Sequence, residues 1–457
     1  MPSFNTHPSS YRDPSGFLFY KNGVLYRQVN KIFKKDFEDF IDTGLYDHLV
    51  DKKILIPHQT INENLTGSED WLQTLQPEVV PFISYPYEWC FDMLKDAALL
   101  TLEAAKEALN FGMMLKDASA YNLQWHGGRM MFIDTLSFES YDEQKPWIAY
   151  RQFCEHFFAP LALMHYLKEP LQNLLLAYPD GVPLSTAKKI LPFKSKLNLH
   201  TSLHIHLQAS VANKLKNNAQ QKPFTKQKMQ NLLRSLEEGI GFFCFSQSPG
   251  VWSNYYEEAN QREDYVKNKK QIVSQWLNKL NVNSVFDAGA NEGEFSEIAA
   301  EKTRQVICAD YDHYSINKFY RKIKKHNWFN LYPLIIDLSN PSPSIGVNNA
   351  ERDSFLKRTK VDLVLALALI HHLAIGRNIP FESIAKMFSG LGEYLIIEFV
   401  PKEDEKIQLM LNQKKDVYHW YNEENFKTAF NQLFTIVENH NVGNSNRNLY
   451  LMMKRNA

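Results

Sequence analysis

The second half of the sequence alternates apolar runs with polar stretches, and this alternation constrains the fold more than any other feature. Five of the runs are short, continuous and bounded by turn residues, as is typical of parallel strands that are buried on both faces. We expect these strands at residues 282–287, 305–310, 331–337, 361–368 and 393–400. A stretch with helical spacing, residues 252–280, precedes them. The pattern predicts a doubly wound, Rossmann-like α/β domain over residues 251–457.

A short loop with two glycines follows the first of these strands. Its residues are Asp287, Ala288, Gly289, Ala290, Asn291, Glu292 and Gly293. Glycine lets the backbone turn sharply and approach a ligand closely, and the Asp287 carboxylate can accept a hydrogen bond from an ammonium group. The glycine spacing is GxxxG and not GxGxxG, which disfavours a nicotinamide dinucleotide site. The loop is therefore expected to hold a ligand with an aminoacyl-type group.

The next two strands also end in acidic residues. Asp310, which Tyr311 follows, ends the second strand, where a carboxylate can accept from both hydroxyls of a ribose. Asp337, which Leu338 follows, ends the third strand and can accept from an adenine amino group. A lone acid in such a position is more often a helix cap. Three acids at the carboxyl ends of successive parallel strands indicate a ligand site, because ligands of open α/β sheets bind at that edge.

With these residues, the second half of the chain resembles the class I S-adenosylmethionine-dependent methyltransferases. Residues 287–293 are similar to the first motif of that family, acidic-x-Gly-x-Gly-x-Gly, with Asn291 in place of the middle glycine, and residues 361–373 are similar to the fourth. The resemblance implies S-adenosylmethionine as cofactor, with Asp310 at its ribose and Asp337 on its adenine side. Residues 340–343, 367–373 and 398–401 also resemble an uncharacterised branch of the family, in which some members are labelled nodulation-related.

Candidate catalytic residues follow the fourth and fifth strands. His371 and His372 stand where the acceptor of a methyl group is expected, and histidine is suited to remove a proton near neutral pH. Either histidine can instead pack at a helix start and only shape the pocket. Glu398 is a second candidate base. Aromatic residues that can line an acceptor pocket, or simply pack together, are Tyr418, Trp420 and Tyr421.

The first half of the chain resembles the protein-kinase-like fold at three polar positions. Asp117 and Asn122 are five residues apart, and Asp134 ends a short apolar run. The resemblance implies a base and two magnesium ligands beside ATP. The sequence lacks a Gly-rich phosphate loop, and Arg27 is the only basic residue deep in the second strand of the hairpin that Asn22-Gly23 closes. We therefore expect a degenerate kinase-like α+β domain at residues 1–180, with an ATP/Mg site as the weaker reading and an α+β domain in which these residues cap turns as the alternative.

Charge is unevenly distributed along the chain. There are 51 basic and 51 acidic residues, so binding of nucleic acid through overall basicity is not expected. Residues 181–234 nevertheless contain ten Lys or Arg and no Asp or Glu. We expect residues 181–250 to form a basic helical connector, or else a docking surface for an anionic partner. The four cysteines lack CxxC spacing, which disfavours a metal site. Neither a targeting signal nor a membrane span is recognisable, so a cytoplasmic location is expected.

These observations favour one function and leave two alternatives. The first hypothesis is a methyltransferase that acts on oxygen of a small-molecule or glycan acceptor, with a kinase-like domain that presents the substrate. The second is a bifunctional kinase-methyltransferase. The third is a binding or scaffold protein with an inactive methyltransferase fold. The sequence leaves the oligomeric state open.

Overall fold

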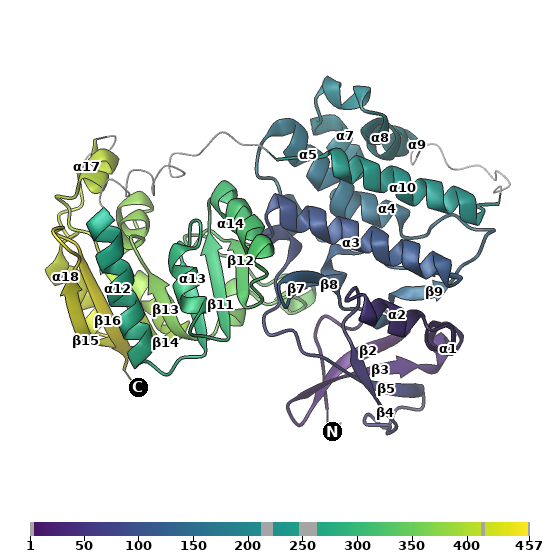
Figure 1. Cartoon of the computed structure of the whole chain (residues 1–457), viewed down its shortest axis with the longest axis horizontal. Coiled ribbons are helices and arrows are strands. Elements are labelled where there is room, and N and C mark those ends of the chain that lie inside the picture. Colours follow the sequence, from purple (N-terminus) through teal and green to yellow (C-terminus); the bar gives the residue numbers. More distant parts are fainter. Residues whose placement is uncertain (1–3, 212–222, 246–262, 413–415, 456–457) are drawn as a thin grey trace. The chain divides into compact units, whose positions relative to one another are not determined.

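The computed structural model of the chain describes residues 4–211, 223–245, 263–412 and 416–455. Its contacts divide the chain into two units (Figure 1). The first unit comprises residues 1–247 and 345–352, and the second comprises residues 248–344 and 353–457. A short segment from the second half of the sequence thus belongs to the first unit.

The second unit is built on one seven-stranded sheet. The order of its strands is β12 (Leu331–Ile335), β11 (Gln305–Asp310), β10 (Ser284–Ala288), β13 (Val361–Ala366), β14 (Gly392–Phe399), β16 (Asn448–Lys454) and β15 (Phe434–Asn441). The five expected strands run parallel to one another, which confirms the α/β prediction for this half. The strand β16 then pairs antiparallel with both β14 and β15, an addition that the sequence analysis did not anticipate.

The strand order places a ligand site at one edge of this sheet. The chain runs from β10 outward to β11 and β12, and then returns to β13 on the other side of β10. At such a reversal, the loops after the two neighbouring strands diverge and leave a crevice at their carboxyl ends. The crevice of this unit therefore lies after β10 and β13, where the predicted motifs stand.

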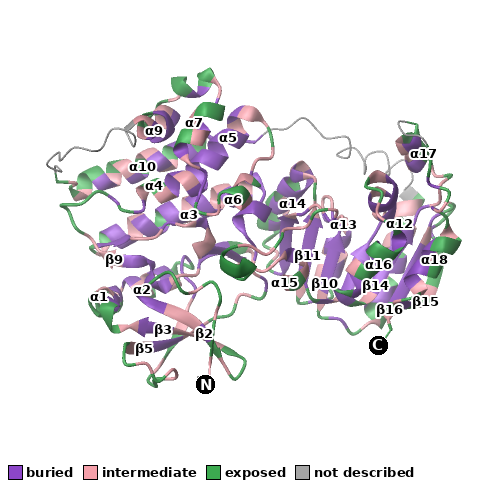
Figure 2. Ribbon diagram, turned by 180° about the vertical axis from the view of Figure 1, so that it is seen from behind, coloured by how far each residue is buried: buried purple, intermediate pink, exposed green. Residues whose placement is uncertain are grey.

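Helices of the second unit pack amphipathic faces beside these strands. They are α12 (Glu263–Lys279), α13 (Glu294–Ala300), α14 (His313–His326), α15 (Phe355–Arg358), the π-helix η9 (His372–Gly376), α16 (Phe381–Ser389), α17 (Glu405–Leu411) and α18 (Glu423–Asn431). In α14, Ile316, Phe319, Tyr320 and Ile323 are buried at helical spacing. Figure 2 shows the central strands as buried, with exposed positions on the outer sides of the helices.

The first unit begins with an antiparallel sheet. Its strand order is β1 (Asn5–Thr6), β2 (Gly16–Lys21), β3 (Val24–Asn30), β5 (Trp71–Pro77) and β4 (His58–Ile61). Asn22 and Gly23 both have positive φ, 53° and 78°, and close the predicted β2–β3 hairpin. Short helices follow β3: η1 (Lys31–Phe33), α1 (Lys34–Asp42) and α2 (Leu45–Asp51), and η2 (Pro86–Glu88) follows β5.

A long helix and two small strand pairs form the middle of the first unit. The helix α3 (Phe91–Asn110) is followed by β6 (Met113–Leu115), which pairs with β9 (Phe138–Ser140), and by β7 (Leu123–His126), which pairs with β8 (Arg129–Phe132). The 3-10 turns η3 (Ala120–Asn122) and η4 (Thr135–Ser137) connect these strands. The three predicted polar residues Asp117, Asn122 and Asp134 lie on the loops and turns between the strands.

The basic stretch of the sequence forms helices of the first unit. These helices are α7 (Leu184–Ile190), η6 (Phe193–Leu197), α8 (Leu199–Thr201), η7 (Ser202–Leu207), α9 (Gln208–Val211) and α10 (Lys226–Phe242). The helices that precede them are α4 (Tyr150–Phe153), η5 (Cys154–Phe158), α5 (Ala159–Leu167) and α6 (Leu174–Ala177). The helix α10 packs along α3. The described part of residues 181–250 belongs by its contacts to the first unit, and some of its apolar residues, such as Ile205, Leu233 and Leu236, are buried there. The predicted boundary between residues 250 and 251 lies outside the described residues. Among the described helices, none is both long enough and apolar enough to cross a bilayer.

Candidate active site

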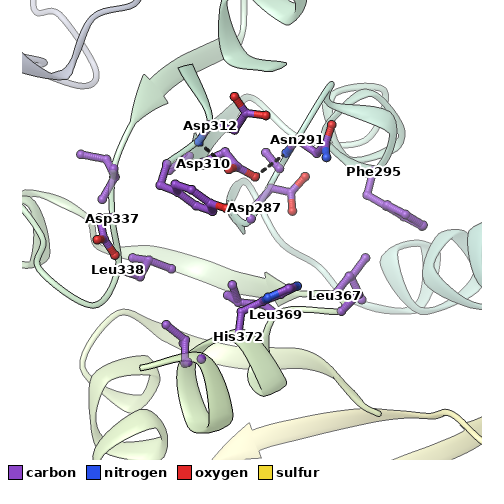
Figure 3. A pocket seen from close by; sticks show the side chains of 18 of the residues that line it. Asp287, Asn291, Phe295, Asp310, Asp312, Asp337, Leu338, Leu367, Leu369 and His372 are labelled. Atoms are coloured by element: carbon purple, nitrogen blue, oxygen red, sulfur yellow. Dashed lines mark hydrogen bonds between the residues drawn. The ribbon is translucent and has the colours of Figure 1, made fainter. Parts of the chain in front are cut away.

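A cavity of about 340 Å³ opens at the carboxyl ends of β10, β11, β12 and β13 (Figure 3). Nine of the residues singled out from the sequence line it: Asp287, Gly289, Ala290, Asn291, Asp310, Tyr311, Asp337, Leu338 and His372. Four others do not: Ala288, Gly293, His371 and Glu398. The three strand-end acids that the sequence predicted to lie together thus share one cavity.

The loop after β10 is held against the end of β11. The backbone N–H groups of Gly289 and Ala290 both donate to the carbonyl oxygen of Ala309, at 2.8 and 3.0 Å. Asn291 has φ of 49°, in the left-handed region that asparagine adopts more readily than most residues. Asparagine therefore fulfils the backbone requirement at the position where the resembling family has its middle glycine.

Gly293 packs the helix after the loop against its neighbour. It has φ of +85°, and a Cβ atom there would lie 2.1 Å from the ring of Phe319 on α14. The loop turns at Gly293 into α13, and no side chain fits at this point. Gly293 therefore shapes the cavity from outside, because it fixes the close approach of α13 to α14.

Asp310 is held by backbone donors. One carboxylate oxygen accepts from the N–H of Asn291 and the other accepts from the N–H of Asp312, both at 2.9 Å. Burial raises the pKa of Asp310 to about 6, and these hydrogen bonds oppose the rise. Each oxygen has a second lone pair, so the carboxylate can still accept from two adjacent hydroxyl groups. In Figure 3 the Asp310 carboxylate lies close to that of Asp287.

Asp287 is buried beneath the loop. Its carboxylate accepts from the hydroxyl of Ser296 on α13 at 2.6 Å. Burial raises the pKa of Asp287 to about 6, the charge of Asp310 raises it further, and Ser296 and Lys269 oppose the change. A carboxylate with a raised pKa at the end of a strand gains most from a cation that approaches through the cavity.

Lys269 is a cavity residue that the sequence analysis missed. It lies on α12 with only 4% of its surface exposed, and its ammonium group donates to Glu398 Oε2 at 2.6 Å. It also lies 4.9 Å from the centre of the Phe295 ring. The signal was present, because Lys269 stands four residues after Tyr265 and four before Val273, on the apolar side of the predicted helix. A charge in that position demands a buried partner.

Glu398 belongs to a buried ion-pair network outside the cavity lining. It is fully buried and accepts from the Tyr265 hydroxyl as well as from Lys269. Arg447 lies 3.7 Å from Glu398 and also binds Asp404 through two nitrogens. Burial raises the pKa of Glu398, but the charges of Lys269 and Arg447 outweigh burial and hold it below the usual value. The carboxylate is committed to these partners.

The two histidines after β13 occupy different places. His372 lines the cavity, opposite Asp287 and Asp310 in Figure 3. Burial and then Arg447 lower the pKa of His372 to about 4, so its imidazole is neutral at physiological pH. His371 is buried, and within the described part of the chain its Nδ1 has no hydrogen-bond partner. Burial holds the pKa of His371 well below the usual value.

The far end of the cavity carries Asp337 and Leu338. Asp337 accepts from the N–H and the hydroxyl of Ser339, at 2.9 and 2.6 Å, and from Arg377 at 3.2 Å. Cavity residues that were not predicted as site residues include Tyr265, Val266, Phe295, Leu369, Arg377 and Met410. Most lie outside the predicted motifs, so their spacing gave no signal.

The predicted aromatic residues separate into two groups. Tyr418 and Trp420 line a second cavity, of about 640 Å³, together with Asn378, Phe381 and other residues. Tyr421 is buried and donates to the carbonyl oxygen of Val400 at 2.8 Å. Tyr421 is thus part of the core beside β14, and the other two form a cavity wall.

The three polar residues of the first unit lie together. The Asp117 carboxylate accepts from the Ser119 N–H at 2.9 Å, and burial and then the charge of Asp134 raise its pKa. Asn122 donates to the Ser137 hydroxyl at 3.2 Å, and that hydroxyl donates to Asp134. Arg27 on β3 forms an ion pair with Asp134. Burial raises the pKa of Asp134, but Arg27 and the hydrogen bonds from Ser137 and Leu136 together lower it below the usual value.

Comparison with solved structures gives weak similarities to methyltransferases. The chain is similar to the N-methyltransferase NodS from Bradyrhizobium japonicum WM9, at 14% identity and a TM-score of 0.31, over 45% of this chain and 100% of that one. It is also similar to the bifunctional kinase-methyltransferase WbdD, at 17% identity and a TM-score of 0.29, over 43% of this chain and 39% of that one. With such scores, the fold is assigned from the strand order and not from these neighbours. No protein-family model matches the chain.

A curated relative resembles the chain over nearly its whole length. Nodulation protein NoeA of Rhizobium meliloti (strain 1021) is 33% identical over 464 residues, which cover 96% of this chain and 94% of that protein. A match of this length includes most of both units. The protein therefore belongs to the family of nodulation protein NoeA.

Proposed function

We propose that the protein is an S-adenosylmethionine-dependent methyltransferase whose cofactor binds in the cavity of the second unit. The observation that carries this proposal is that Asp287, Asp310 and Lys269 line one cavity. An α-amino acid carries an ammonium and a carboxylate, and Asp287 and Lys269 offer the complementary charges. The Asp310 carboxylate accepts the two hydroxyls of a ribose, and Leu338 and Leu369 supply apolar walls for a purine.

The cofactor, when bound, supplies a methyl group on a sulfonium, which is already a good leaving group. The chain then has to hold the ligand and orient it, because alignment and exclusion of water account for most of the catalysis of such a displacement. Asp310 holds the ribose of the cofactor and Asp287 holds its ammonium group, while Lys269 is itself held in place by Glu398. Phe295, Leu367 and Met410 exclude water from the cavity.

We propose a hydroxyl group of a small molecule or glycan as the methyl acceptor, entering beside His372. The neutral imidazole of His372 can accept a hydrogen bond from the acceptor hydroxyl and orient it, but with a pKa of about 4 it is a weaker base than the groups that typically give about 10²–10⁴-fold. Tyr418 and Trp420 present aromatic faces in the second cavity, next to polar Asn378 and Asn425. Aromatic faces combined with amide groups suit an acceptor with both apolar and hydroxyl-bearing surfaces.

The test is binding of S-adenosylhomocysteine to the intact chain, measured by calorimetry. The Asp310→Ala variant should bind about 1–3 kcal/mol more weakly, because it loses charge-assisted hydrogen bonds to the ribose. Asp353→Ala is the matched control, since Asp353 is a carboxylate of the same unit that does not line the cavity. Equal affinity of the Asp310→Ala variant and the native chain would sink the proposal.

For the first unit we propose a degenerate kinase-like domain that does not transfer phosphate. The pairing of β6 with β9 and of β7 with β8 supports the kinase-like arrangement, with Asp117, Asn122 and Asp134 between them. The ion pair between Arg27 and Asp134 occupies the carboxylate that a magnesium ion would need. Magnesium-ATP should therefore leave the thermal unfolding of the intact chain unchanged. A stabilisation that Asp134→Ala abolishes would favour the bifunctional alternative.

A further inference from the structure

The segment between α7 and α9 exposes apolar side chains and buries polar ones, the reverse of the usual pattern. Phe193, Leu197 and Leu199 expose 72%, 77% and 74% of their surfaces. By contrast, Ser195, Thr201 and His204 are fully buried. An ordinary surface helix of a globular protein turns its apolar stripe inward, so this arrangement needs an explanation outside the core.

The exposed side chains stand on an ordered support. The Ser195 hydroxyl bonds to His206 Nε2 at 2.8 Å and to the carbonyl oxygen of Pro192 at 2.7 Å. The His204 ring bonds to the hydroxyls of Tyr150 and Ser235, at 2.8 and 3.0 Å. These buried hydrogen bonds fix the inner side of the segment, so the outer side is held in place as well.

The apolar-basic patch is defined here as six exposed apolar residues and four lysines: Ile190, Phe193, Leu197, Leu199, Leu203 and Leu207, with Lys188, Lys189, Lys194 and Lys196. In Figure 2 the ribbon around α7 carries exposed positions. Lys194 and Lys196 approach the rings of Tyr166 and Phe193, and Lys188 donates to Ser210. Within the described part of the chain, none of the four lysines pairs with a carboxylate, and residues 181–234 contain no acid.

We propose that the apolar-basic patch attaches the first unit to the surface of an anionic lipid bilayer. Large apolar side chains with interleaved lysines are the composition of interfacial membrane-binding segments, whose apolar residues enter the acyl boundary while lysines contact acidic headgroups. Six exposed apolar residues between positions 190 and 207 are more than the scattered single apolar residues of an ordinary surface. Charge complementarity selects an anionic partner.

A second copy of the chain is a poorer occupant. A twofold contact brings the same surface together from both copies, so the lysines of one patch would face the lysines of the other. Like charges opposed in this way are unfavourable unless acids intervene, and this stretch contains none. An acidic protein remains the competing partner that the experiment has to separate from lipid.

The experiment is sedimentation of the intact chain with phosphatidylcholine vesicles, with and without phosphatidylglycerol. The native chain should bind the phosphatidylglycerol vesicles, and binding should weaken as salt is raised. The double variant Phe193→Ser with Leu197→Ser should bind these vesicles at least about tenfold more weakly, because it removes two side chains that insert into the bilayer. Lys194→Gln with Lys196→Gln should also weaken binding about tenfold and reduce the salt dependence.

Two controls keep the result interpretable. Phe329→Ser changes an equally exposed phenylalanine of the second unit, 68% exposed, and should bind vesicles as the native chain does. Thermal unfolding of the patch variants should match the native chain, because the replaced side chains are mostly in solvent. Absence of vesicle binding by the native chain, or equal binding by the patch variants, would overturn the proposal. So would binding to soluble polyglutamate without binding to vesicles, which would assign the patch to an acidic protein, or patch-dependent self-association without vesicle binding.

Discussion

Clustered carboxylates occur in both units, but different groups neutralise them. In the second unit, Asp310 accepts from backbone N–H groups and Asp287 accepts from a serine hydroxyl, so both retain charge that burial makes costly. In the first unit, an ion pair with Arg27 meets the charge of Asp134. The pKa values follow, since burial raises those of Asp287 and Asp310 to about 6 while that of Asp134 is lowered.

The comparison teaches that an acid at a strand end is not by itself a binding residue. What matters is whether the chain itself supplies the counter-charge. A carboxylate surrounded by neutral donors is poised for a cationic or hydroxyl-bearing ligand. One that is paired internally contributes to the fold instead.

The largest expected effect comes from Lys269→Met, which should lower the free energy of unfolding by roughly 3–5 kcal/mol. The variant leaves the Glu398 carboxylate buried without its closest cation, and such uncompensated charges are strongly destabilising. Lys270→Met is the matched control, because the neighbouring Lys270 is more exposed and pairs with Glu294 at 3.0 Å. Its loss should be below about 1 kcal/mol in chemical denaturation. Similar losses in the two variants would contradict the network described here.

The pH dependence of cofactor binding gives the next effect. The affinity for S-adenosylhomocysteine should fall about tenfold between pH 7.5 and 5.5, because Asp287 and Asp310 must both be ionised to bind it. The stability of the ligand-free chain should change with pH in the opposite direction. Their folded-state pKa values are raised above the ordinary 3.8, so their contribution to stability is present below pH 4 and is lost as the pH rises through 6. An affinity that does not change between pH 5.5 and 7.5 would contradict the role given to the ionised Asp287 and Asp310.

The smallest effect on the cofactor is expected from Arg27→Gln. The variant should leave the affinity for S-adenosylhomocysteine within about twofold of the native value, because Arg27 belongs to the first unit. It should nevertheless lower the thermal unfolding temperature, since Asp134 then lacks its ion-pair partner. A large loss of cofactor affinity would show that the Asp134 cluster acts on the cavity and is not a purely structural group.

Much of the second unit could be predicted from the sequence, because parallel strands buried on both faces leave continuous apolar runs. The strands predicted at 282–287, 305–310, 331–337, 361–368 and 393–400 all occur, and nine predicted residues line one cavity. The β15–β16 pair was missed. The position of Lys269 on the apolar side of the predicted helix was a signal, but its partner Glu398 could not be predicted, because the two meet only through the fold. The sequence also left His371 and His372 as equal candidates, and only the structure, in which a π-helix begins at His372, separates them.

The first unit was harder to predict because its polar contacts join residues from elements that are far apart in the sequence. The hairpin at Asn22-Gly23 has a local signal, and it was found. The ion pair between Arg27 and Asp134 joins positions that are 107 residues apart, and no local pattern indicates it. The basic stretch at 181–234 was interpreted from its charge, but Ser195, His204 and His206 in it are buried, and its lysines flank exposed leucines. The charge pattern alone could not reveal the buried hydrogen bonds that hold this segment.

The measurement that tests the central claim most directly is a calorimetric titration of the intact chain with S-adenosylhomocysteine and, separately, with 5′-methylthioadenosine. The two compounds share the adenine and ribose, but the second lacks the amino-acid group that Asp287 and Lys269 are proposed to hold. The account predicts binding of one S-adenosylhomocysteine per chain and an affinity for 5′-methylthioadenosine that is weaker by about 10²-fold or more, as expected when two charged contacts are lost. Equal affinities would contradict the amino-acid subsite, and absence of binding by both compounds to a folded sample would contradict the cofactor assignment itself.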